Sequence, residues 1–166
     1  MTNFVPSQRA ISRICTEDIE RLAELSEQYS SIRDLANILI LAGGKTVIFD
    51  GWGSATDLET MATVGKFIDA KDVDTAMARL AECEEGFCHS NAGELLSDHS
   101  DFQPVYAFAL NYLYKKCPFW MEHFILKHIP TGKYHESTDI ITIKKCFVMD
   151  ISKRQFMDMM EREPSW

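Results

Sequence analysis

Residues 104–113 read PVYAFALNYL, and this stretch decides which fold the sequence predicts. Its apolar residues fall on nearly every face of a helix with 3.6 residues per turn, which is typical of a helix buried on all sides. Pro104 suits the first turn of such a helix, and Pro118 lies beyond its end. We therefore predict that 105–113 forms the central helix of the core.

Further helices are expected where capping residues precede an apolar repeat of helical spacing, as Thr56 with Glu59 and Ser152 with Gln155 do. The expected helices cover residues 17–29, 31–42, 56–68, 72–86 and 152–160, and 91–99 is either a short helix or a loop. Residues 46–49 predict a buried strand, 139–150 a small antiparallel sheet, and 119–129 stays ambiguous. The expected fold class is α+β: one helix-rich domain over 1–166, with about seven helices and a small, mostly antiparallel sheet.

The charge of the chain is unevenly distributed. The formal net charge is −8, and residues 51–101 alone contain 3 basic and 11 acidic residues, which also gives −8. Neutralising phosphates requires a clustered basic face, so direct nucleic-acid binding is not expected. The acidic middle segment favours a protein partner with a basic surface.

The sequence also bears on the compartment. Residues 1–10 lack the apolar region of a signal peptide, and the run at 38–42 is far shorter than the roughly 20 apolar residues that cross a bilayer. Five cysteines is an odd number, which argues against a secreted disulfide framework. We therefore expect a cytoplasmic protein with reduced thiols and no membrane association.

Cysteine and histidine cluster in one part of the chain. All five histidines and three of the five cysteines fall between Cys83 and His135. Thiolate and imidazole are the ligands that structural zinc selects, and two pairs in this cluster have short internal spacing. The candidate zinc ligands are Cys83, Cys88, His123 and His128. The spacing between the pairs does not match a compact zinc finger, and in a strand the two histidines would point to opposite faces. We expect no cofactor, with zinc as the alternative.

The same cluster permits a cysteine nucleophile with a histidine base. This chemistry requires the thiol and the imidazole within hydrogen-bond reach, and a third group that orients the imidazole. Cys88 and His89 are adjacent in sequence, so their side chains are expected to diverge. Cys88 would need a distant partner such as His123 or Asp101, which the sequence alone cannot place.

Asp50-Gly51-Trp52-Gly53-Ser54 directly follows the predicted strand at 46–49. Carboxylates at strand ends followed by glycines are common positions for functional sites, because the strand aims the acid and the glycines allow close approach. Trp52 is expected to be either a core residue or an exposed recognition residue.

Taken together, these features favour a non-enzymatic, intracellular protein-binding module, such as an inhibitor or adaptor that occupies a basic surface of a larger partner. The residues expected to contact the partner are acidic, aromatic or Met: Trp52, Glu82, Glu84, Glu85, Asp98, Asp101, Met157 and Trp166. The alternative is a metal-dependent or cysteine-dependent enzyme that uses the cluster between Cys83 and His128. The oligomeric state stays open.

Overall fold

A mixed six-stranded sheet forms the centre of the molecule in the computed structural model, which describes residues 8–80, 88–138 and 143–163. The strands are β1 (Thr46–Ile48), β2 (Lys66–Asp69), β3 (Phe102–Asn111), β4 (Phe119–His128), β5 (Tyr134–His135) and β6 (Ile143–Asp150). Their order is β1-β4-β3-β6-β2, and β5 also pairs with β4. Among the strand pairs of the described residues, only β1–β4 is parallel.

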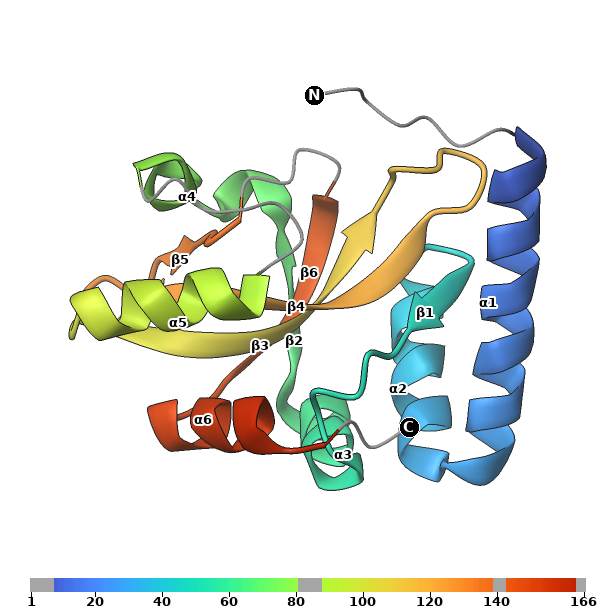
Figure 1. The fold of residues 1–166 in the computed structure, drawn as a ribbon, viewed down its shortest axis with the longest axis horizontal. Coiled ribbons are helices and arrows are strands. Elements are labelled where there is room, and N and C mark those ends of the chain that lie inside the picture. The colour runs from blue at the N-terminus through green and yellow to red at the C-terminus, as the bar shows by residue number, and fades with distance from the viewer. Residues whose placement is uncertain (1–7, 81–87, 139–142, 164–166) are drawn as a thin grey trace.

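The helices are α1 (Gln8–Gln28), α2 (Ser30–Leu41), α3 (Ala55–Val64), α4 (Ala76–Leu80), α5 (Cys88–Asp98) and α6 (Lys153–Glu161), with a 3-10 turn, η1 (Ala70–Asp72). Figure 1 shows α1 and α2 side by side at the end of the sheet where β1 lies. None of the helices that the structure describes is both long enough and apolar enough to span a bilayer.

The predicted central helix is wrong: residues 102–111 form β3, the middle strand of the sheet. β3 is buried on both faces, since Tyr106 and Phe108 contact one core cluster while Val105 and Ala107 contact another. A strand covered on both sides is apolar at every position, so its sequence has no alternation to distinguish it from a buried helix.

The predicted proportions of the fold are therefore also wrong. The class is α+β, but the described residues form six α-helices around a six-stranded sheet, rather than about seven helices with a small sheet. Besides β3, the ambiguous stretch 119–129 supplies a second long strand, β4. Ile68, which was expected at the end of a helix, lies in the edge strand β2.

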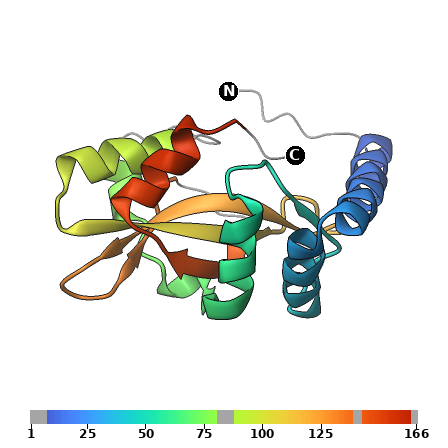
Figure 2. The same ribbon diagram turned by 90° about the horizontal axis from the view of Figure 1, so that it is seen from below.

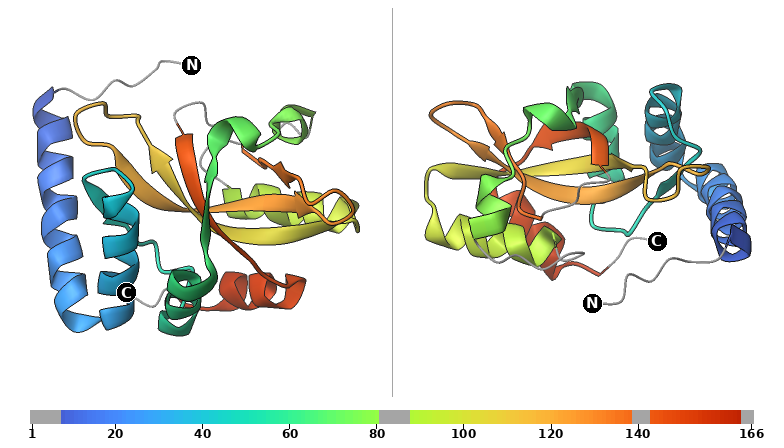
Figure 3. Two further views of the ribbon diagram at one scale, coloured as in Figure 1. Left: turned by 180° about the vertical axis from the view of Figure 1, so that it is seen from behind. Right: turned by 90° about the horizontal axis from the view of Figure 1, so that it is seen from above.

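Helices cover mainly one face of the sheet. On that face, side chains of α2, α3, α5 and α6 pack against Tyr106, Phe108, Trp120 and Phe124 of the sheet. Figure 2 shows α5 and α6 together on this side. The other face is covered in part by Ile68, Ala70 and Val73. Figure 3 (left) shows the chain running from β2 through η1 to α4 across the sheet.

The predicted helix starts are only partly confirmed, since α1, for example, begins at Gln8 rather than at residue 17. The Ser152–Gln155 capping box at the start of α6 is confirmed, with both reciprocal hydrogen bonds present. At α3 the box is formed two residues earlier than predicted, by Ser54 and Asp57.

Cys15 and Cys117 form a disulfide that joins α1 to the connection between β3 and β4. This differs from the expectation of reduced thiols. Disulfides persist mainly in oxidising compartments, so this bond weighs against the predicted cytoplasmic location.

Candidate active site at the open edge of β4

The site lies at a gap in the pairing of β4. β3 covers one edge of β4 completely, whereas on the other edge β1 pairs only with Phe119–Met121 and β5 only with Leu126–Lys127. Between them, side chains take over the backbone groups of Phe124. Its carbonyl accepts a hydrogen bond from Ser137 Oγ at 3.2 Å, and its N–H points to the sulfur of Cys88.

Three side chains from different elements meet at this gap: Cys88 of α5, His123 of β4 and Glu136, which follows β5. His123 is fully buried, and its Nε2 lies 2.7 Å from Glu136 Oε1. The carboxylate accepts this bond, so Nε2 carries the proton and Nδ1 is the nitrogen left for another partner. Nδ1 makes no conventional hydrogen bond to any described residue. The other group that interacts with the ring is the Cys88 thiol.

Glu136 is itself held in place by backbone groups. Its Oε1 also accepts hydrogen bonds from the N–H groups of Ser137 and Thr138, at 3.1 and 3.3 Å. Its own N–H donates to the carbonyl of Asp74 at 2.7 Å. In addition, Asn91 Nδ2 of α5 donates to Thr138 Oγ1 at 3.0 Å, which ties the helix carrying Cys88 to the segment carrying Glu136.

The electrostatics of the three groups favour an ion pair between thiolate and imidazolium. Burial and, to a smaller extent, the charge of Glu136 oppose ionisation of the Cys88 thiol, but His123 and the Phe124 N–H outweigh both, so the pKa of this thiol lies below its ordinary value. Burial likewise opposes protonation of His123, but Glu136 and Cys88 hold its pKa well above the usual range. A lowered thiol pKa beside a protonated imidazole is typical of nucleophilic cysteines. By contrast, burial raises the pKa of the other described free cysteine, Cys146.

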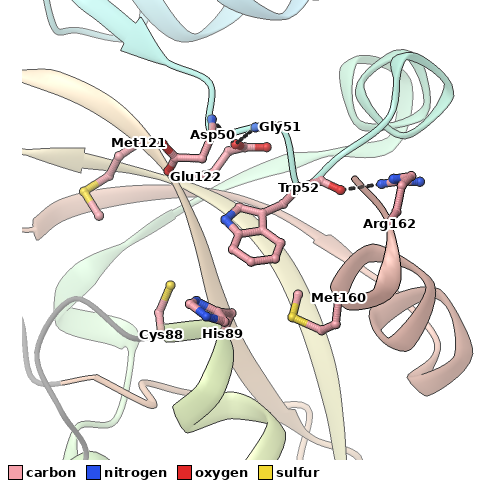
Figure 4. A pocket seen from close by; sticks show the side chains of 9 residues that line it. All are labelled: Asp50, Gly51, Trp52, Cys88, His89, Met121, Glu122, Met160 and Arg162. Atoms are coloured by element: carbon pink, nitrogen blue, oxygen red, sulfur yellow. Dashed lines mark hydrogen bonds between the residues drawn. The ribbon is translucent and has the colours of Figure 1, made fainter. Parts of the chain in front are cut away.

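A cavity of about 450 Å³ opens onto Cys88 (Figure 4). Its wall includes Trp52, Met121 and Met160, and its polar groups include Asp50 and Arg162. The volume falls within the usual range for small-molecule sites. The thiol is therefore placed where a substrate can reach it, while His123 lies buried behind it.

The four predicted zinc ligands are not tested as a set, because Cys83 lies outside the described residues. Cys88 and His123 do come together. His128 does not join them: its Nε2 lies 2.9 Å from Asp101 and its Nδ1 lies 2.7 Å from Thr131. Within the described ranges, no group of three or more His, Cys, Asp or Glu side chains is arranged to hold a metal ion. Zinc binding stays a prediction.

The predicted partner-binding residues are only partly visible. Glu82, Glu84, Glu85 and Trp166 lie outside the described residues. Asp98 and Asp101 are exposed, Met157 is exposed on α6, and Trp52 is half-buried at the cavity. Binding of a basic protein partner stays a prediction.

From the sequence, His123 was one of the predicted partners of Cys88, but no sequence pattern indicated Glu136 as the residue that orients the imidazole. β5 has only two residues, which is too short for a recognisable periodic pattern, and the orienting carboxylate directly follows it.

Comparisons of this chain with protein-family models, with curated proteins and with solved structures found no match.

Proposed function

We propose that this protein is a cysteine-dependent acyl-transfer enzyme, with Cys88 as nucleophile, His123 as general acid and base, and Glu136 as the residue that orients the imidazole. The observation that carries the proposal is the meeting of these three groups at the open edge of β4, with the thiol facing a cavity. Nucleophile, base and orienting group in this relation define a catalytic triad by geometry, whatever the fold.

The reaction would proceed in two steps. The Cys88 thiolate attacks the carbonyl carbon of a carboxylic acid derivative, a C–S bond forms, and the carbonyl electron pair moves to oxygen. The C=O bond then re-forms, the leaving group departs with its bonding electrons, and His123 supplies its proton. The product is a thioester on Cys88. Water, or an amine, next attacks this thioester and gives a proton to His123, and the carboxylic acid or new amide leaves as Cys88 returns to the thiolate.

The first test is the pH dependence of alkylation by iodoacetamide, followed at each cysteine by peptide mass spectrometry. An ordinary thiol, with a pKa of about 8.5, loses about tenfold in rate for each pH unit below that value. We expect Cys88 to remain reactive well below pH 8, because its pKa is lowered. Buried Cys146 is the internal control and should stay unreactive in the folded protein.

The second test uses p-nitrophenyl acetate, an activated ester that needs no specific recognition. The wild type should release p-nitrophenolate in a burst of about one equivalent and carry one acetyl group on Cys88, whereas Cys88→Ser should show neither. If Cys88 is alkylated like an ordinary thiol and never acetylated, the proposed function is wrong.

A further inference from the structure

Glu122 is a buried carboxylate beside the cavity that the proposed reaction does not use. Only 3% of it is exposed, and its carboxylate accepts hydrogen bonds from the backbone N–H groups of Asp50, Gly51 and Gly53 and from the hydroxyl of Tyr106. The bonds from Gly51 and Gly53 are 2.9 and 3.3 Å long. Four donors on one carboxylate leave little capacity for a substrate. Glu122 is therefore suited to fixing the loop that follows β1.

The residue that this loop presents is Trp52, which lies between two constrained glycines. Gly51 has φ of 87°, a conformation that side chains rarely adopt. A Cβ atom at Gly53 would lie 2.6 Å from the Tyr106 hydroxyl. The carbonyl of Trp52 accepts a hydrogen bond from Arg162, which also pairs with Asp57 at 3.2 Å. The backbone of Trp52 is thus held on both sides and at its carbonyl.

The indole ring is fixed as well. It packs against the His89 ring, with centroids 4.6 Å apart, and meets the edge of Phe124 at 6.2 Å. Figure 4 shows the six-membered ring of the indole turned toward Met160, and its nitrogen-bearing edge turned away from Met160, toward the part of the cavity between Asp50 and Cys88. No hydrogen bond from the indole N–H to another described residue is present. Buried groups therefore anchor the loop that carries Trp52, while the indole N–H faces the cavity without an acceptor among the described residues.

Acyl transfer creates a need for such a donor. When a thiolate adds to a carbonyl carbon, negative charge develops on the carbonyl oxygen, and fixed donors aimed at that oxygen stabilise the transition state. On the basis of the proposed function, we infer that the Trp52 indole N–H donates to this oxyanion, and that Glu122 acts as a positioning residue for Trp52.

The test compares two reactions of the same thiol. Acetylation by p-nitrophenyl acetate passes through an oxyanion, whereas alkylation by iodoacetamide displaces iodide and does not. Both rates are measured at about pH 8, above the pKa of Glu122, which burial raises to about 7. In Trp52→Phe the acetylation rate of Cys88 should fall by about 10²–10³, the usual effect of removing one oxyanion donor, while the alkylation rate changes less than about threefold.

A second replacement isolates the N–H itself. Incorporation of 3-benzothienylalanine at position 52 keeps the shape of indole and exchanges only the N–H for sulfur, so it serves where Trp52→Phe disturbs folding. The same selective loss of acetylation is expected. Glu122→Gln should reduce acetylation more than alkylation as well, because the loop loses its anchor.

The outcomes separate the two proposals. Equal losses of acetylation and alkylation would show that Trp52 only supports the thiol, and unchanged acetylation would show that it is not a donor; either result overturns the inference and leaves the proposed function intact. A wild-type Cys88 that is never acetylated overturns both.

Discussion

Both histidines of β4, His123 and His128, pair with a carboxylate, but the surroundings of the two pairs differ. His123 and Glu136 lie 2.7 Å apart, with side chains 0% and 8% exposed, whereas His128 and Asp101 lie 2.9 Å apart, with side chains 23% and 51% exposed. The second ring nitrogen of His128 faces Thr131, whereas the His123 ring interacts with the Cys88 thiol. Almost the same contact therefore belongs to a candidate reaction site in one place and to a surface turn in the other.

The comparison shows that burial and the third partner, rather than the pair itself, determine what a histidine can do. Charges interact more strongly where water is excluded, whereas exposed pairs are screened and contribute little to stability. The buried pair also cannot be broken without leaving a carboxylate in a site that water does not reach. Variants matched between the two pairs can test this difference.

The largest contrast is expected between His123→Ala and His128→Ala. Removing His123 leaves Glu136 buried without its partner, and such a loss costs about 3–5 kcal/mol of unfolding free energy. It also removes the general base, so acetylation of Cys88 should fall by at least about 10². His128→Ala should leave both the stability and the acetylation rate close to those of the wild type. Urea unfolding and the p-nitrophenyl acetate burst measure the two quantities.

If His123→Ala fails to fold, His123→Gln is the substitute, because an amide can still donate to Glu136. Equal effects of the two alanine variants on acetylation would remove the distinction between the pairs.

A smaller contrast is expected between Glu136→Gln and Asp101→Asn, which remove charge and keep size. The glutamine can still accept the hydrogen bond from His123, but it stabilises the imidazolium less. The pKa of His123 should fall. The glutamine also removes a negative charge that itself raises the pKa of the Cys88 thiol, but this direct effect is smaller than that of His123. The pKa of Cys88 should therefore rise toward its ordinary value, and the alkylation profile of Cys88 should move by about one pH unit to higher pH. Asp101→Asn should leave the profile unchanged. A purely structural role for Glu136 would lower stability without moving the profile.

The two pairs also show what the sequence could predict. The short spacing of His123 and His128 suggested a pair of metal ligands. Both residues lie in the strand β4, an odd number of positions apart, so their side chains point to opposite faces of the sheet. Once β4 is known to be a strand, only one of the two can face Cys88. The ambiguity of residues 119–129 is therefore one reason that the proposed triad could not be placed from the sequence, besides the absence of a signal for Glu136.

Two elements defined by local chemistry were found where they were predicted, whereas elements defined by their surroundings were not. The strand at 46–49 and the Ser152–Gln155 cap depend on neighbouring residues and were found. β3 depends on being covered on two faces, and Glu136 depends on a two-residue strand reaching the edge of β4, so both require the tertiary structure. Trp52 was identified as a residue of interest, but its anchor Glu122 gave no signal in the sequence.

The smallest effect is expected in the acid stability of the exposed pair. The hydrogen bond from His128 is the main cause that lowers the pKa of Asp101, so the folded state binds the Asp101 proton less tightly than the unfolded state. This interaction stabilises the fold above the unfolded pKa of about 3.9 and is lost as the pH falls through the lower, folded value. In Asp101→Asn, that part of the acid-induced loss of stability should be absent, and stability between about pH 6 and 8 should change only slightly. Thermal unfolding of wild type and Asp101→Asn from about pH 3 to 7 measures the difference.

Because Asp101 is exposed, added salt should further reduce this difference in stability between wild type and Asp101→Asn. The alkylation profile of Cys88 depends on buried groups and should respond little to salt. A strong salt dependence of the Cys88 profile would mean that the buried pair is screened like the exposed one.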